Sequence, residues 1–117
     1  MKPDRFTTIA QEALAAAQSD ALTRSNPEVS GLHILAALIA DRNGPGASVV
    51  QRAGADPSRV RQVVEAELSR LPKTSSGAGA TGRAVMEILT KAEAESKRMG
   101  DAYVSSEHLL LALADCS

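Results

Sequence analysis

Aromatic side chains are nearly missing from this sequence: its 117 residues include one Phe, one Tyr and no Trp. Strands usually depend on runs of aromatic and β-branched residues, and no such run of strand length occurs here. Most of the apolar residues are instead Ala, Leu and Val, which suit a core between closely approaching helices. The composition therefore predicts an all-α fold.

The sequence also lacks an excess of either charge, a long apolar run and a pair of cysteines. Thirteen Lys and Arg balance 14 Asp and Glu, so the basic surplus of a nucleic-acid-binding protein is missing. No run of about 18 apolar residues predicts a membrane span, and residues 1–5 lack the apolar core of a secretory signal. A single Cys is typical of a reducing cytosol. We expect one cytoplasmic domain that binds neither nucleic acid nor membrane.

Apolar residues recur at spacings of three and four, the period of amphipathic helices. The pattern predicts helices over about 8–24, after the capping Ser30, over 47–53, from Asp56–Pro57 to Pro72, over 85–99, and after the capping Ser105. The expected buried positions are Ala10, Ala13, Leu14, Ala17, Ala21, Leu35, Leu38, Ile39, Val60, Val63, Val64, Leu68, Leu71, Val85, Ile88, Leu89, Ala92, Met99, Leu109, Leu110 and Leu113.

The two halves of the chain repeat each other at an offset of 75 residues, with Leu14 matching Leu89 and His33 matching His108. Copy one covers about residues 6–72, a Gly- and Ser-rich stretch over 73–82 is a flexible linker by composition, and a partial copy two covers 83–117. The repeat predicts a pseudo-two-fold helical bundle. Copy two has no equivalent of residues 47–71, so we expect a natural domain with two further helices.

Residues that could carry chemistry are few. Two histidines and Cys116 fall short of the four ligands of a structural zinc site, and Cys116 lies too near the end of the chain for a nucleophile fixed in a cleft. Each histidine follows a capping serine by three residues, which indicates a structural role. There is no P-loop. We expect no catalytic site, metal or cofactor in this chain.

Two short patterns occur in both copies: Leu-x-x-Ala over 14–17 and 89–92, and His-(Ile or Leu)-Leu over 33–35 and 108–110. With these patterns the chain resembles the Clp N-terminal repeat over essentially its whole length. Residues 4–7, the Arg-Leu-Pro over 70–72 and the Gly-Asp at 100–101 with the Val-Ser-Ser-Glu over 104–107 resemble the ClpB-type branch.

The resemblance implies a module that binds exposed apolar segments of unfolded or aggregated polypeptides. Such a module sits on a hexameric, ATP-driven disaggregase ring that works with a DnaK-type chaperone, and the ATP and Mg²⁺ sites belong to the ring domains. The module alone is expected to be a monomer. Two alternatives stay open: an adaptor-docking domain of a ClpC- or ClpA-type unfoldase that feeds a protease, and a structural module that binds no client.

The resemblance also assigns Thr7, Asp101 and Glu107 to substrate handling, with Leu89 and His108 on the groove side. At the position of His108 the branch commonly has an apolar residue, so this wall is expected to be more polar here. We expect removal of either carboxylate to weaken client binding and to change folding little.

Each polar candidate has an ordinary explanation as well. Thr7 precedes a helix and is a good N-cap, Asp101 lies in a Gly-Asp turn, and Glu107 suits the positive end of a helix dipole. Copy one has Leu32 in place of Glu107, so the repeat itself does not require that carboxylate.

Overall fold

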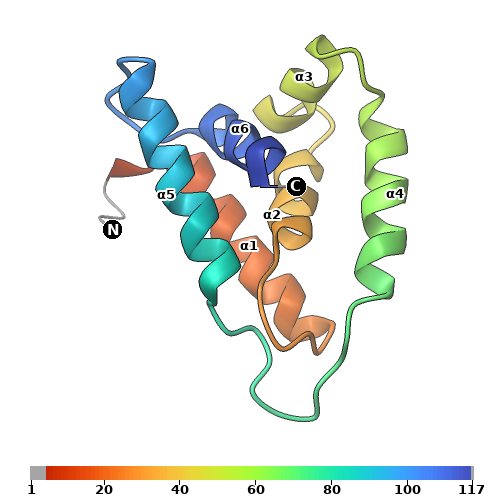
Figure 1. The fold of residues 1–117 in the computed structure, drawn as a ribbon. Coiled ribbons are helices and arrows are strands. Elements are labelled where there is room, and N and C mark those ends of the chain that lie inside the picture. Colours follow the sequence, from red (N-terminus) through yellow and green to blue (C-terminus); the bar gives the residue numbers. More distant parts are fainter. Residues whose placement is uncertain (1–4, 117) are drawn as a thin grey trace.

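The computed structural model describes residues 5–116, and this part of the chain folds into six helices without a strand longer than an isolated bridge (Figure 1). None of these helices is both long and apolar enough to cross a membrane. The all-α prediction is confirmed. The helices are α1 (Thr8–Thr23), α2 (Gly31–Ile39), α3 (Pro45–Arg52), α4 (Pro57–Ser69), α5 (Arg83–Arg98) and α6 (Ser106–Cys116).

The helices begin where the capping residues predict. The Thr7 hydroxyl accepts a hydrogen bond from the Ala10 N–H at 3.1 Å, and the Asp56 carboxylate accepts one from the Ser58 N–H at 3.0 Å. Helix α3 begins at Pro45, two residues earlier than expected, because proline at the first helical position needs no N–H partner.

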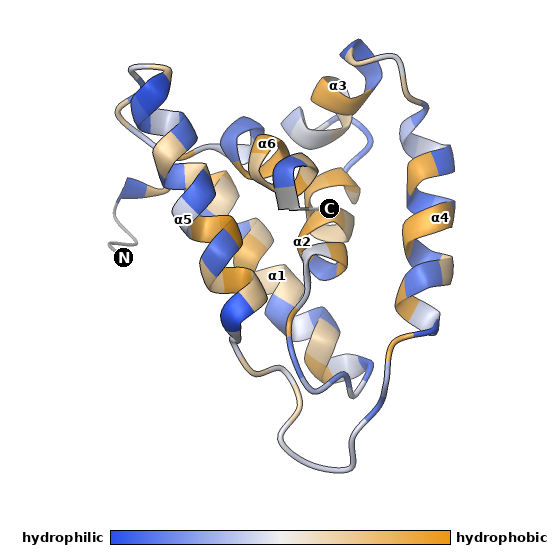
Figure 2. Cartoon of the chain, in the orientation of Figure 1, coloured by the Kyte–Doolittle hydropathy of each residue, from blue (hydrophilic) through white to orange (hydrophobic). Residues whose placement is uncertain are grey.

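Small side chains on α1 form the centre of the core. Ala10, Ala13, Ala17 and Ala21 are all buried, so α1 packs closely against α2. Figure 2 shows α2 as hydrophobic over most of its length, which fits its place between α1 and α4.

Part of the predicted core is wrong. Val63 and Met99 are 58% and 43% exposed. Helix α4 packs mainly against α2, so of its residues only Val64 and Leu68 are buried and Val63 points away. On α2 Leu38 and Ile39 are buried as predicted and Ile34 is buried as well, while Leu35 is half-buried and lines a surface groove.

The two copies are joined by a crossed pair of backbone contacts. The Val104 N–H donates to the Arg5 carbonyl at 2.8 Å, and the equivalent Val29 N–H donates to the Ala80 carbonyl at 3.0 Å. In each copy, the segment before the first helix thus pairs with the valine that lies two residues before the second helix of the other copy. This arrangement confirms the predicted pseudo-symmetry at the level of single hydrogen bonds.

The same contacts change the interpretation of the linker. The Thr74, Gly79 and Ala80 N–H groups donate to the carbonyls of residues 25, 26 and 27, at 2.7, 2.9 and 3.0 Å. Composition predicts a flexible connection over 73–82, but the structure holds it against the turn after α1. Backbone hydrogen bonds hold this segment in place, and amino-acid composition gives no information about such bonds.

The turns after α1 and α5 are also equivalent. Both contain a residue in the left-handed region: Ser25 has φ of 61° and Gly100 has φ of 73°. This conformation suits glycine and costs other residues roughly 1–2 kcal/mol. A β-carbon added at Gly100 would meet no atom within 4 Å, so only backbone strain opposes a side chain there.

We therefore expect opposite effects from exchanging the two residues. Gly100→Ser should lower the free energy of unfolding by about 1 kcal/mol or more, whereas Ser25→Gly should leave it unchanged or raise it slightly. Urea unfolding of the two variants beside the wild type measures this. Destabilisation by both substitutions would contradict the left-handed assignment at Ser25.

A buried histidine closes the start of α2. His33 Nδ1 accepts a hydrogen bond from the Ser30 N–H at 2.9 Å, the role that Glu or Gln has in a capping box. Because Nδ1 accepts, the proton is on Nε2, which lies 2.8 Å from Asn26 Oδ1. The Asn26 amide in turn donates to the Pro72 carbonyl at 3.0 Å. A chain of polar groups therefore joins the start of α2 to the end of copy one.

Burial lowers the pKa of His33 below its ordinary value of 6.5, because the charged imidazolium would lose its hydration. Protonation of Nδ1 would also turn the acceptor of the Ser30 N–H into a donor. The folded protein therefore resists taking up this proton, whereas the unfolded chain takes it up near pH 6.5.

It follows that stability should be full above about pH 6.5 and decrease as the pH falls toward the lower folded-state pKa. The slope for one proton is at most about 1.4 kcal/mol per pH unit. Urea unfolding at pH 7.5 and 5.5 measures the loss. His33→Gln keeps an acceptor for the Ser30 N–H and cannot titrate, so it should flatten this dependence. An unchanged slope in that variant would exclude His33 as its source.

Candidate functional site

Thr7 lies where the beginning of the chain meets the turn before α6. Its N–H donates to the Val104 carbonyl at 2.9 Å, next to the bridge between Phe6 and Val104. Phe6 is buried beneath this contact. The contact brings Thr7 beside the loop that carries Asp101, although the two residues are far apart in the sequence. The predicted capping role of Thr7 is confirmed, and its position also makes it part of this surface.

Asp101 and His108 are direct partners. Asp101 Oδ2 lies 2.8 Å from His108 Nε2, and His108 Nδ1 accepts a hydrogen bond from the Ser105 N–H at 2.8 Å. The accepting Nδ1 again puts the proton on Nε2, which donates to the carboxylate. His108 is 3% exposed and the Asp101 side chain 47% exposed, so the imidazole is internal and the carboxylate faces outward. His108 therefore orients Asp101.

Backbone bonds fix the same loop from the other side. The Asp101 N–H donates to the Ser96 carbonyl at 2.8 Å, and the buried Ser96 hydroxyl donates to the Asp101 carbonyl at 3.2 Å. The carboxylate of Asp101 is thus presented from a rigid turn.

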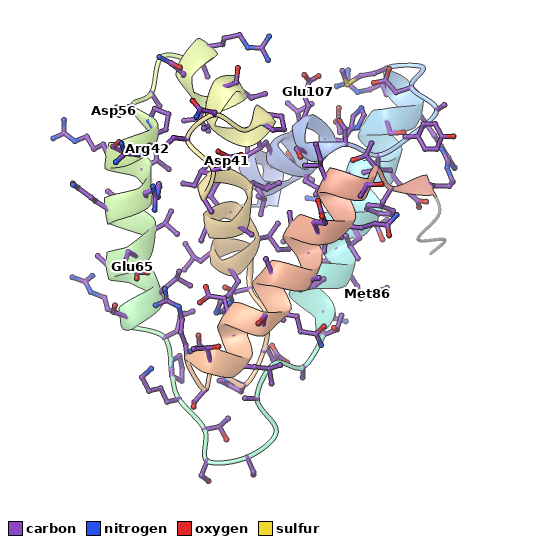
Figure 3. All side chains as sticks on the ribbon, turned by 180° about the vertical axis from the view of Figure 1, so that it is seen from behind. Asp41, Arg42, Asp56, Glu65, Met86 and Glu107 are labelled. Atoms are coloured by element: carbon purple, nitrogen blue, oxygen red, sulfur yellow. The ribbon has the colours of Figure 1, made fainter. Side chains whose placement is uncertain are left out.

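Glu107 is exposed in the first turn of α6 (Figure 3). Within the described residues its carboxylate has no hydrogen bond or ion pair. Its counterpart Leu32 is half-buried and lines a depression between α2 and α5, so the side chains at this position differ in their surroundings between the two copies. Glu107 directly precedes His108, and both lie in the first turn of α6.

Leu89 lies apart from these residues. It is half-buried and lines a cavity of about 200 Å³ between α1 and α5, together with its counterpart Leu14. None of the other four candidates lines this cavity. The structure therefore pairs Asp101 with His108, brings Thr7 beside the loop that carries Asp101, and leaves Leu89 in a separate apolar depression. Glu107 lies directly before His108.

Sequence reasoning missed the partnership of Asp101 with His108. Asn26 and Asp101 precede the two histidines by the same seven residues, and each contacts the histidine of its own copy. This shared offset was the available signal. Copy one places a neutral amide that is 1% exposed at the position where copy two places a charged, solvent-facing carboxylate.

The arrangement of these side chains suits polar recognition. In the part of the chain that the structure describes, no group of three or more His, Cys, Asp and Glu side chains could hold a metal ion. The His108 imidazole has both nitrogens engaged in the fold. The outward carboxylates and the apolar depression can instead contact a polypeptide.

Comparison with known proteins agrees with this architecture. The family model of the Clp repeat (R) N-terminal domain matches residues 5–117. The chaperone protein ClpB of Propionibacterium freudenreichii is 34% identical over 118 aligned residues, which cover 98% of this chain. The chain spans 14% of the length of that relative.

Solved structures share the fold. The Hsp104 N-terminal domain from Candida albicans has a TM-score of 0.81 at 27% identity, over 92% of this chain and 72% of that one. A structure with a peptide from the EAEC T6SS Sci1 SciI protein has a TM-score of 0.84 at 23% identity, over 96% of this chain and 71% of that one. Together with the match over residues 5–117, these findings show that the chain belongs to the Clp N-terminal repeat family.

Proposed function

We propose that this chain is the client-binding module of a ClpB-type disaggregase and binds exposed apolar segments of unfolded or aggregated polypeptides. The ring domains of the same kind of protein, with ATP and Mg²⁺, would supply the work, in cooperation with a DnaK-type chaperone in the cytoplasm. The module itself is a monomer without catalytic activity.

The observation that carries the proposal is the hydrogen bond from the Thr7 N–H to the Val104 carbonyl at 2.9 Å. It holds Thr7 against the segment 101–107, which is distant in the sequence and carries Asp101 and Glu107. The exposed Tyr103, 58% accessible, adjoins Val104 and adds an apolar contact there. Apolar surface with a few polar groups at its rim is what recognition of an unfolded segment requires.

Each residue has a distinct role in this proposal. Glu107 and the outward oxygen of Asp101 contact the client's N–H groups and cationic side chains. Thr7 lies at the edge of the same surface. His108 is a positioning residue that holds Asp101 and does not itself touch the client. Leu89 supplies apolar wall in the neighbouring depression.

We call Thr7, Asp101 and Glu107 the binding rim. The structure changes which substitution at Asp101 tests this rim. Asp101→Ala removes the acceptor of the buried His108 Nε2–H, so it should lower stability by about 1–3 kcal/mol, contrary to the expectation from sequence that folding changes little. Asp101→Asn keeps an amide oxygen for this N–H, as Asn26 does in copy one, and removes only the charge.

We expect the double variant D101N/E107Q to melt like the wild type and to bind fluorescent casein several-fold more weakly, because exposed polar substitutions usually change stability within about 0.5 kcal/mol. Fluorescence anisotropy titration and thermal melts of the same samples measure both. D101A serves as the contrast that loses stability. Wild-type casein affinity in the double variant would exclude the two carboxylates from the binding rim.

Leu89 and Leu14 provide a matched pair for the apolar wall, since both line the same cavity from equivalent positions. Each Leu→Ala substitution should cost less than the about 2–5 kcal/mol of a fully buried leucine. Casein binding should weaken more for L89A than for L14A. Equal loss of binding in both variants would indicate a purely structural contribution of Leu89.

A further inference from the structure

A second surface, away from Thr7, lies along the contact between α2 and α4. Helix α4 is attached to α2 through Val64 and Leu68 and leaves a groove on each side of this contact. One groove, which we call the apolar groove, is lined by Leu32, Leu35, Val60 and Val63, together with the charged residues Asp56, Arg59 and Glu67. The other has a volume of about 630 Å³ and is bordered by Arg24, Arg42 and Arg61; we call it the basic groove.

Helix geometry separates the two grooves. Val64 borders both grooves. Of the other α4 residues, 58, 61, 62, 65, 66 and 69 line the basic groove, and 59, 60, 63 and 67 line the apolar one. At 100° per residue these two sets lie on opposite sides of the buried Val64 and Leu68. The two grooves are therefore distinct surfaces.

The three arginines of the basic groove differ in whether they form ion pairs. Arg24 is paired with Asp20 at 2.9 Å and with Glu65, which neutralises one end of the groove. Arg42 and Arg61 are exposed and form no ion pair within the described residues. Figure 3 shows Arg42 beside α4, at the far end of α2 from its first turn. Two guanidinium groups are thus free to donate hydrogen bonds to a ligand.

The floor between these arginines is small and apolar. Ala36 of α2 and Ala40 directly after this helix line it, and Gln62 of α4 adds a polar side chain at the border. Guanidinium groups bind carboxylates through two parallel hydrogen bonds, and alanine leaves room for a backbone to approach.

We propose that the basic groove binds an acidic polypeptide segment, with Arg42 and Arg61 on its carboxylates and small apolar side chains against the alanine floor. A nucleic acid fits less well: no aromatic side chain lines the groove for base stacking, Glu65 borders it, and the whole chain carries a net charge of −1. The inference concerns a surface separate from the client rim and does not depend on the proposed function.

The test uses a fluorescein-labelled peptide of alternating Glu and Ala, with an equally labelled Gln–Ala peptide for comparison. We expect the acidic peptide to bind more tightly, and R42Q and R61Q each to raise its Kd about threefold, as expected for exposed ion pairs. Binding should weaken in 0.5 M salt, since exposed charges are screened. Neither variant should change the thermal melt.

Arg59→Gln is the matched control, because it removes the same charge from the same helix on the side of the apolar groove. It should leave the Kd unchanged. An equal effect of R59Q would show that only net charge matters and would overturn the proposal, as would equal binding of the Gln–Ala peptide.

Other occupants give different results. Tighter binding of a single-stranded RNA, with the same dependence on Arg42 and Arg61, would replace the peptide by a nucleic acid. Self-association in sedimentation velocity that R42Q/R61Q abolishes would assign the groove to a second copy of the chain. D101N/E107Q should bind the acidic peptide normally, so failure of the client rim and failure of the basic groove are distinguishable.

Discussion

The arrangement of the whole domain depends on the backbone hydrogen bonds that cross between its two copies. The contacts of Val104 with Arg5 and of Val29 with Ala80 are equivalent, and each ties the entrance of one copy to the second helix of the other. Thr7 meets the loop before α6 because of the first contact, and the linker lies against the turn after α1 because of the second. The candidate rim therefore belongs to both copies and could not form within either one alone.

Both copies of the repeat close their second helix in the same way but place it in different surroundings. Both copies close their second helix with a serine N–H and a histidine Nδ1, and both orient the imidazole through a side-chain oxygen seven residues earlier. In copy one this oxygen belongs to a buried amide that continues to the Pro72 carbonyl. In copy two it belongs to a carboxylate at the surface. One change of residue type, with the same geometry, turns an internal link into a charged group at the surface.

Much of the fold could be predicted from the sequence, because the information is local. Caps such as Thr7 and Asp56, the proline at position 57 and the three-and-four spacing located all six helices to within a few residues. Burial was less predictable: Val63 fits the helical stripe, but α4 has too few neighbours to cover it. The linker could not be predicted either, since its backbone bonds to residues 25–27 do not depend on side chains. Of the candidate site, the resemblance supplied the residues, but only the structure showed that His108 holds Asp101 and that Leu89 lies in another depression.

The narrow attachment of α4 has a consequence for both grooves beside it. Val64 and Leu68 form the line of contact of α4 with α2, and a groove lies on either side of this line. Because the two grooves share α4 as a wall, the cavity left by truncation of either side chain would disturb the charged and the apolar surface together. The packing of two side chains thus sets the shape of two surfaces.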